Sequence, residues 1–86
     1  MAKTILIVDD STSLRTVVKL ALVRAGYDVL EASDGKQGLA QLDKAGKVNL
    51  IVSDVNMPVM DGIAFVTQVK QHPRHKFTPV IMLTTE

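Results

Sequence analysis

We predict an α/β fold with a parallel sheet from two features of the sequence. Short apolar runs rich in β-branched residues alternate with longer segments in which apolar residues recur every three or four positions. The runs are apolar on both faces, as in strands that lie between two layers of helices. With 86 residues, the chain is expected to form one domain with the element order βαβαβαβ.

The first predicted strand covers residues 4–8, and a helix follows it. Ser11, Thr12 and Ser13 are residue types that cap helix N-termini, whereas Gly26 tolerates the left-handed conformation that ends a helix. Between them, apolar residues recur at helical spacing and predict a stripe that faces the core. This stripe consists of Leu14, Val17, Val18, Ala21, Leu22 and Ala25.

The second strand is predicted at residues 27–32, where Glu31 suggests an edge of the sheet. Ser33 or Asp34 then caps a second helix, which is expected to end near Gly46. The buried residues expected in this helix are Leu39 and Leu42.

The third strand is predicted at residues 48–53, and Asp54 follows it directly. Residues 55–61 contain a proline and lead to a glycine, so we expect a loop. A third helix is predicted at about 63–71, and a fourth strand at 79–83. The residues of this helix expected to face inward are Ile63, Val66 and Val69.

Three carboxylates follow predicted strands. If the first helix covers one face of the sheet and the other two cover the opposite face, right-handed crossovers give the strand order 2-1-3-4. The order then reverses between the first and third strands, where open α/β sheets bind ligands beyond the strand carboxyl ends. Asp9, Asp10 and Asp54 are expected to meet there. An all-oxygen site without Cys or a nearby His favours Mg²⁺ or Mn²⁺ over zinc, and the alternative is that these are ordinary turn residues.

Composition excludes several classes of function. The formal net charge of +1 gives no electrostatic case for binding nucleic acid or an anionic membrane. The absence of cysteine excludes disulfides, thiolate metal sites and a Cys nucleophile. No apolar run approaches the ~20 residues that span a bilayer. No glycine-rich phosphate-binding motif follows the first strand. We therefore expect a soluble cytoplasmic domain.

The segment after the third predicted helix is rich in basic residues. We interpret it as a solvated basic turn, and a His-x-x-His metal site or a partner-binding patch are the alternatives. Its residues are Lys70, His72, Arg74, His75 and Lys76.

Four motifs, which together extend along the whole chain, carry a family resemblance. They are Ile-Leu-Ile-Val-Asp-Asp-Ser at 5–11, Asp-Gly at 34–35, Ser-Asp-Val-Asn-Met-Pro-Val-Met-Asp-Gly at 53–62, and Pro-Val-Ile-Met-Leu-Thr-Thr-Glu at 79–86. With them the sequence resembles the CheY-like receiver domain of two-component response regulators. The resemblance implies a flavodoxin-like, doubly wound parallel sheet, a fold for which CheY is itself a standard example.

The resemblance also implies a role for each site residue. Asp54 would be the phosphoacceptor, and a histidine kinase would be the phosphodonor. Asp10 and Asp54 would ligate Mg²⁺ directly, together with the backbone carbonyl of Asn56, while Asp9 would act through water. Thr84 would be the switch hydroxyl that contacts the phosphoryl group. A chain of this kind is a phosphoacceptor signalling module and not an enzyme.

The sequence departs from the family pattern in one respect. The family's helix 4, strand 5 and helix 5 have no counterpart, and neither does the lysine at the end of strand 5. We therefore expect residues 1–86 to be a partial receiver domain in which phosphorylation is impaired. The strand at 79–83 would lie at an open sheet edge, and we expect a homodimer that buries it. Pairing of this edge with a second copy and an exchange of elements between two chains are both compatible with this expectation.

Two alternatives to this function remain. The first is a structural fragment that self-assembles without signalling competence. The second is a metal-dependent aspartyl phosphatase, a chemistry that places a second Asp two positions after its nucleophile. Ser11 occupies that position relative to Asp9, which counts against the phosphatase.

Overall fold

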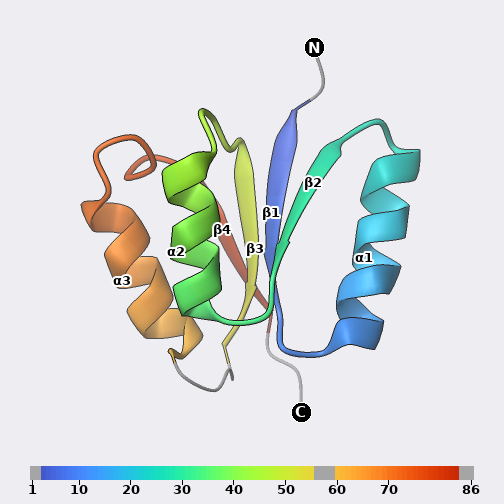
Figure 1. The fold of residues 1–86 in the computed structure, drawn as a ribbon, viewed down its shortest axis with the longest axis horizontal. Coiled ribbons are helices and arrows are strands. Elements are labelled where there is room, and N and C mark those ends of the chain that lie inside the picture. The colour runs from blue at the N-terminus through green and yellow to red at the C-terminus, as the bar shows by residue number, and fades with distance from the viewer. Residues whose placement is uncertain (1–2, 56–59, 84–86) are drawn as a thin grey trace.

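A computed structural model describes residues 3–55 and 60–83, and its four strands form one parallel sheet in the order β2-β1-β3-β4 (Figure 1). The strands are β1 (Thr4–Val8), β2 (Asp28–Ala32), β3 (Leu50–Asp54) and β4 (Val80–Leu83). The helices are α1 (Thr12–Arg24), α2 (Gly35–Lys44) and α3 (Gly62–Gln71). The predicted α/β class, element order and strand order are confirmed.

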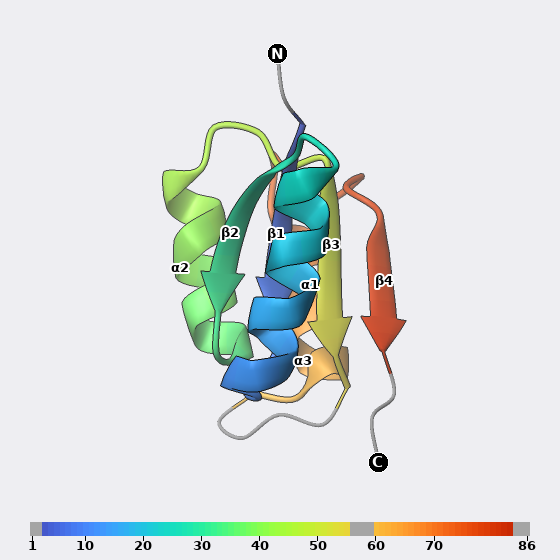
Figure 2. The ribbon, with the colours of Figure 1, turned by 90° about the vertical axis from the view of Figure 1, so that its right-hand side faces the viewer.

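The helices cover the sheet unequally. Figure 1 shows α2 and α3 together on one face of the sheet and α1 by itself on the other. Seen from the α1 side, α1 lies in front of the central strands, and β4 stands at the outer edge of the sheet (Figure 2). No helix within the described residues is long and apolar enough to cross a membrane.

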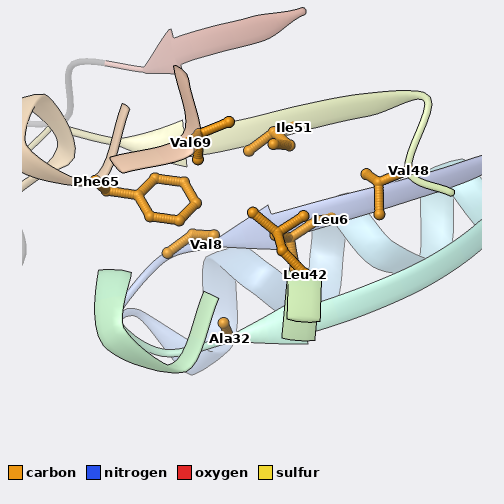
Figure 3. Packing of buried hydrophobic residues seen from close by; sticks show 8 residues of the cluster. All are labelled: Leu6, Val8, Ala32, Leu42, Val48, Ile51, Phe65 and Val69. Atoms are coloured by element: carbon orange, nitrogen blue, oxygen red, sulfur yellow. The ribbon is translucent and has the colours of Figure 1, made fainter. Parts of the chain in front are cut away.

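The core lies between the sheet and the pair α2–α3 (Figure 3). Phe65 of α3 is fully buried there, next to Val8 at the end of the central strand β1. Gly38 of α2 makes room for this ring, because a Cβ atom at Gly38 would lie 2.9 Å from Cε1 of Phe65. The buried cluster consists of Leu6, Val8, Ala32, Leu42, Val48, Ile51, Phe65 and Val69.

The predicted inward face of α3 is wrong at one position. Ile63 is 63% exposed, whereas Gly62, Phe65 and Val69 are the buried residues of the helix. Val69 is buried as predicted and Val66 is half-buried, so the buried stripe starts at Gly62 and contains Phe65 in place of Ile63.

The predicted core face of α1 is confirmed only in part, because Val17, Ala21 and Ala25 are exposed. No residue of α1 is buried, and Val17 is 64% exposed. Leu14, Val18 and Leu22 are half-buried. The reason is the layer arrangement: α1 has no neighbouring helix among the described elements, so its flanks remain open to solvent.

The predicted N-terminal caps of α1 and α2 and the end of α1 before Gly26 are confirmed, whereas α2 ends at Lys44, two residues before the predicted Gly46. Ser11 caps α1 by accepting a hydrogen bond from the Leu14 N–H, and Asp34 caps α2 by accepting one from the Gln37 N–H. Gly26 follows α1 with a φ of +96°, a conformation that a side chain would strain.

The basic segment after α3 is not simply solvated. His75 is 1% exposed, and its Nε2–H donates to the carbonyl oxygen of Leu42 at the end of α2, at 3.0 Å. Its Nδ1 atom is buried without a hydrogen-bond partner. The prediction of a solvated turn is therefore wrong for His75, which fastens the segment to α2.

Candidate functional site

The two acidic residues that follow β1 and the last residue of β3, also acidic, meet at one edge of the sheet. Val8 pairs with Ser53 in the parallel register, so Asp9 and Asp54 leave the sheet side by side. Oxygen atoms of Asp9, Asp10 and Asp54 all lie within 4.8 Å of one another. The structure thus brings together the three carboxylates that the sequence placed at the strand ends.

Burial and repulsion act on this cluster. Asp9 is 4% exposed and Asp54 is 3% exposed, whereas Asp10 is open to solvent. Burial raises the pKa of Asp9 above its ordinary value, and the negative charges of Asp54 and Asp10 raise it further. A hydrogen bond from the Ser11 N–H, at 2.8 Å, and the charge of Arg15 act in the opposite direction. On balance the pKa of Asp9 stays raised, and a bound cation would reduce the repulsion among the three carboxylates.

Arg15 is a site neighbour that the sequence reasoning missed. Its Nη1 donates to the backbone carbonyl of Asp9 at 2.7 Å, and its Nε donates to Glu31 of β2 at 3.2 Å. Lys19, one turn further along α1, also pairs with Glu31, at 3.0 Å. The i, i+4 spacing of two cationic residues opposite an acidic strand residue was the available signal. These contacts fix the start of α1 against the edge strand and the end of β1.

Gly62, the first residue of α3, lies against the end of β3. The Gly62 N–H donates to the carbonyl oxygen of Val55 at 2.9 Å. A Cβ atom at Gly62 would lie 2.5 Å from the carbonyl oxygen of Asp54. Asp61 caps α3, because its Oδ1 accepts a hydrogen bond from the Ala64 N–H at 2.8 Å. Asp61 and Gly62 therefore fix the start of α3 beside the end of β3.

Two of the five predicted site residues, Asn56 and Thr84, lie outside the described residues, as does the loop proline Pro58. The described part of the site consists of the three carboxylates with Arg15 beside them.

The donor set of this cluster suits a hard divalent cation. All three side chains offer carboxylate oxygens, which are the ligands that Mg²⁺ prefers. Two of the carboxylates are buried side by side, an arrangement that is costly unless a cation or proton compensates the charge. A magnesium ion held by these residues would therefore fit the site.

Comparison with known proteins agrees with this arrangement. Residues 5–86 match the response regulator receiver domain family. Over 83 residues the chain is 42% identical to the chemotaxis protein CheY1 of Helicobacter pylori, covering 95% of this chain and 67% of that protein. It is also 42% identical to the alkaline phosphatase synthesis transcriptional regulatory protein PhoP of Bacillus subtilis, covering 100% of this chain and 35% of that protein.

Comparison with solved structures also finds response regulators. The chemotaxis response regulator CheY4 of Vibrio cholerae matches with a TM-score of 0.94 and 49% identity, covering 100% of this chain and 71% of that one. The chain thus spans about two thirds of the length of these chemotaxis relatives. Motifs, strand order, carboxylate cluster and relatives lead to one conclusion: the chain belongs to the response regulator receiver domain family.

Proposed function

We propose that the chain is the phosphoacceptor module of a chemotaxis-type response regulator, in which Asp54 accepts a phosphoryl group from a histidine kinase. The observation that carries the proposal is the position of Asp54, which is buried at the end of β3 with Asp9 and Asp10 within 4.8 Å. A protein described as a sensor histidine kinase, CheAY of Helicobacter pylori, contains a segment 34% identical to 94% of this chain. That segment covers 10% of the kinase.

The transfer needs little covalent chemistry from the protein. A carboxylate oxygen of Asp54 attacks the phosphorus of a phosphohistidine, and an O–P bond forms as the N–P bond breaks. The electron pair of the N–P bond returns to the imidazole, which takes up a proton and leaves. Positioning and neutralisation of charge supply most of the catalysis in such reactions. The hydrogen bond from the Gly62 N–H to the Val55 carbonyl, next to Asp54, supports a fixed position for this carboxylate.

We assign the magnesium ligands as Asp10 and Asp54 directly, the backbone carbonyl of Asn56, and Asp9 through water. The crowded carboxylates and the raised pKa of Asp9 support a cation here. The assignments of Asn56, and of Thr84 as the switch hydroxyl, rest on the family resemblance. When bound, the ion would neutralise negative charge on the carboxylates and on the phosphoryl oxygens.

The proposed role is stoichiometric and not that of a turnover enzyme, because the phosphoryl group stays on Asp54. A metal-dependent aspartyl phosphatase would need a second acidic residue two positions after its nucleophile. Ser11 stands there relative to Asp9, and its Oγ accepts a hydrogen bond from the Leu14 N–H in the cap of α1. Its side chain thus serves the helix start and offers no carboxylate for acid–base chemistry.

Phosphorylation by acetyl phosphate with Mg²⁺, followed by intact-mass measurement, tests the proposal. The chain should gain one phosphoryl group, and Asp54→Asn should abolish the gain. Asp61→Asn is the matched control, because Asn also caps a helix and α3 should stay intact. Phosphorylation of the Asp54→Asn variant at the unchanged rate would contradict the assignment.

We further propose that the 86-residue polypeptide is phosphorylated slowly. The family's lysine at the end of strand 5, which neutralises the transferred group, has no counterpart in this sequence. Loss of one such donor typically costs roughly 3–4 kcal/mol, or about 10²–10³ in rate. A rate equal to that of a receiver with all five strands, measured in parallel, would show that the lysine is not needed.

We also propose that the 86-residue chain self-associates through β4. The edge strand β2 carries Asp28 and Glu31, charges that discourage pairing with another chain. The other edge, β4, has the sequence Val-Ile-Met-Leu, and Ile81 is 49% exposed. Pairing of two β4 edges in a closed dimer would cover this strand.

Sedimentation equilibrium at micromolar concentration measures this association. A dimer is expected, and Ile81→Lys should convert it to a monomer. Ile63→Lys is the control, since Ile63 is similarly exposed but lies on α3. A stable, folded monomer of 9.3 kDa for the unmodified chain would refute the proposal.

A further inference from the structure

A cavity of about 260 Å³ opens at the end of the sheet opposite the carboxylates. It lies between residues 46–49, which lead into β3, and residues 74–79, which lead into β4. Lys47 and Arg74 contribute cationic side chains to its wall, and Phe77 contributes an aromatic ring. We call it the Phe77 cavity. Its residues have no part in the proposed phosphoryl transfer.

Positive charge is concentrated around the Phe77 cavity. Residues 43–49 and 70–79 contain five of the ten Lys and Arg residues and one acidic residue, Asp43, although the whole chain has a formal charge of only +1. The Asp43 carboxylate contacts His72 and does not line the cavity. Among the described residues, no carboxylate oxygen lies within 4.0 Å of the cationic groups of Lys47, Arg74 or Lys76. The cavity wall therefore presents positive charge that no carboxylate pairs directly within the described chain.

Phe77 is the most exposed large apolar side chain described, with 86% of its surface accessible. The Nζ atom of Lys76 lies 5.1 Å from the centre of its ring, within the range of a cation–π contact. An aromatic ring held outward beside a cavity provides contact area at a low cost in side-chain entropy.

The backbone around the Phe77 cavity is anchored on α2. Nη2 of Arg74 donates to the carbonyl oxygen of Asp43 at 2.9 Å, and buried His75 donates to that of Leu42. His72 pairs with the Asp43 carboxylate at 3.0 Å. These contacts hold the guanidinium and the segment in place before any ligand arrives, which lowers the entropy cost of binding.

We propose that the Phe77 cavity binds an acidic peptide segment of a partner protein. An apolar side chain of that segment packs against Phe77, and flanking Asp or Glu residues pair with Lys47 and Arg74. The volume is below the 300–1,000 Å³ typical of small-molecule sites and suits one or two side chains. A single-stranded nucleic acid is disfavoured, because such sites stack successive bases on several aromatic residues. Phe77 is the one aromatic residue that lines the cavity.

Fluorescence anisotropy with a labelled heptapeptide, Asp-Glu-Glu-Trp-Glu-Glu-Asp, tests the proposal. Binding should weaken about tenfold or more in Lys47→Glu, which reverses a charge on the wall, and by a similar factor in Phe77→Ala. Lys36→Glu is the matched control: it makes the same charge change in the exposed first turn of α2 and should alter affinity less than twofold. Circular dichroism should show all three variants folded, because these positions are exposed.

Three results would overturn the proposal. The first is no binding of the peptide at millimolar concentration, and the second is equal binding by Lys47→Glu, Phe77→Ala and the unmodified chain. The third is a ten-nucleotide oligothymidylate binding as tightly as the peptide, which would assign the surface to nucleic acid. The proposal is independent of phosphorylation, so Asp54→Asn should bind the peptide with unchanged affinity.

Discussion

Substitution of Gly62 by Ala tests how closely the start of α3 packs against the end of β3 beside the carboxylate site. Gly62 is buried and is the first residue of α3. Its added Cβ would meet the carbonyl oxygen of Asp54 at 2.5 Å, the Met82 Cε at 2.5 Å and the Val55 Cα at 2.9 Å. Two of these atoms belong to the backbone and cannot rotate away, whereas the Met82 methyl group is the end of a flexible side chain.

The expected loss in the free energy of unfolding follows from these distances. The oxygen of Asp54 must move from 2.5 Å to at least the 3.0 Å that real Cβ contacts respect, a shift of about 0.5 Å. Insertion of a carbon into a packed site of this kind costs typically ~1–3 kcal/mol. Ala favours helix over Gly by up to ~1 kcal/mol, which offsets part of the cost. We expect a net loss of about 1–2 kcal/mol in the free energy of unfolding, or roughly 5–15 °C in Tm.

Urea unfolding followed by circular dichroism measures this loss, because the chain contains no Trp for fluorescence. The midpoint should fall without a change in the m-value. Gly46→Ala is the control, since its Cβ would meet no atom within 4 Å and its φ is not in the left-handed region. That variant should be as stable as the unmodified chain or slightly more stable.

The same substitution should disturb the site. Because the clash involves the Asp54 carbonyl, the amide shifts of Asp54 and Val55 should change in Gly62→Ala, and the rate of phosphorylation by acetyl phosphate should fall. Unchanged stability together with unchanged shifts would refute the reasoning, because it would mean that a methyl group fits between Gly62 and the end of β3.

Three further expectations concern the core, an ion pair and the metal. Phe65→Ala should cost about 3–5 kcal/mol in denaturant unfolding because Phe65 is fully buried, while Ile63→Ala on the exposed face of α3 should cost less than ~0.5 kcal/mol. The hydrogen bond from Lys19 lowers the pKa of Glu31 in the folded chain below its ordinary value of 4.5. The ionised carboxylate therefore stabilises the fold at pH values above 4.5, and this stabilisation is lost as the pH falls through the lowered pKa of the folded state. Relative to Glu31→Gln, the unmodified chain should therefore lose ~0.3–1 kcal/mol between neutral pH and acid. Titration with Mg²⁺ should shift the amide signals around Asp10, and Asp10→Ala should remove the response.

Most of the secondary structure was predictable from the sequence because it depends on local chemistry. The strand 4–8 was predicted with its observed bounds, and the other strands to within two residues at each end. The N-cap of α1 at Ser11 follows from the preference of serine for that position. The left-handed conformation of Gly26 follows from the backbone freedom of glycine. For α2, the choice between Ser33 and Asp34 stayed open until the structure showed the Asp34 side chain accepting from the Gln37 N–H.

Burial was less predictable because apolar spacing shows that a helix has two faces but not how much surface the rest of the protein covers. Val17 belongs to a regular apolar stripe yet is 64% exposed, since α1 stands alone on its side of the sheet. Phe65 is in the centre of the core, while Ile63 at the start of the same helix is exposed. His75 belongs to a segment that was predicted to be solvated, but it is buried because it contacts the end of α2 and donates a hydrogen bond to the Leu42 carbonyl.

The sequence by itself determined the α/β class, the strand positions and the three carboxylates, because strand ends, caps and breakers act over a few neighbouring residues. It also carried the receiver motifs, in which Asp54 follows a buried strand. Only the tertiary structure decided that Arg15 reaches the backbone of Asp9, and that the carboxylate oxygens lie within 4.8 Å. Only the tertiary structure shows that Lys47, Arg74 and Phe77 line the same cavity. Those facts depend on the register and layering of segments far apart in the chain, which local propensities do not encode.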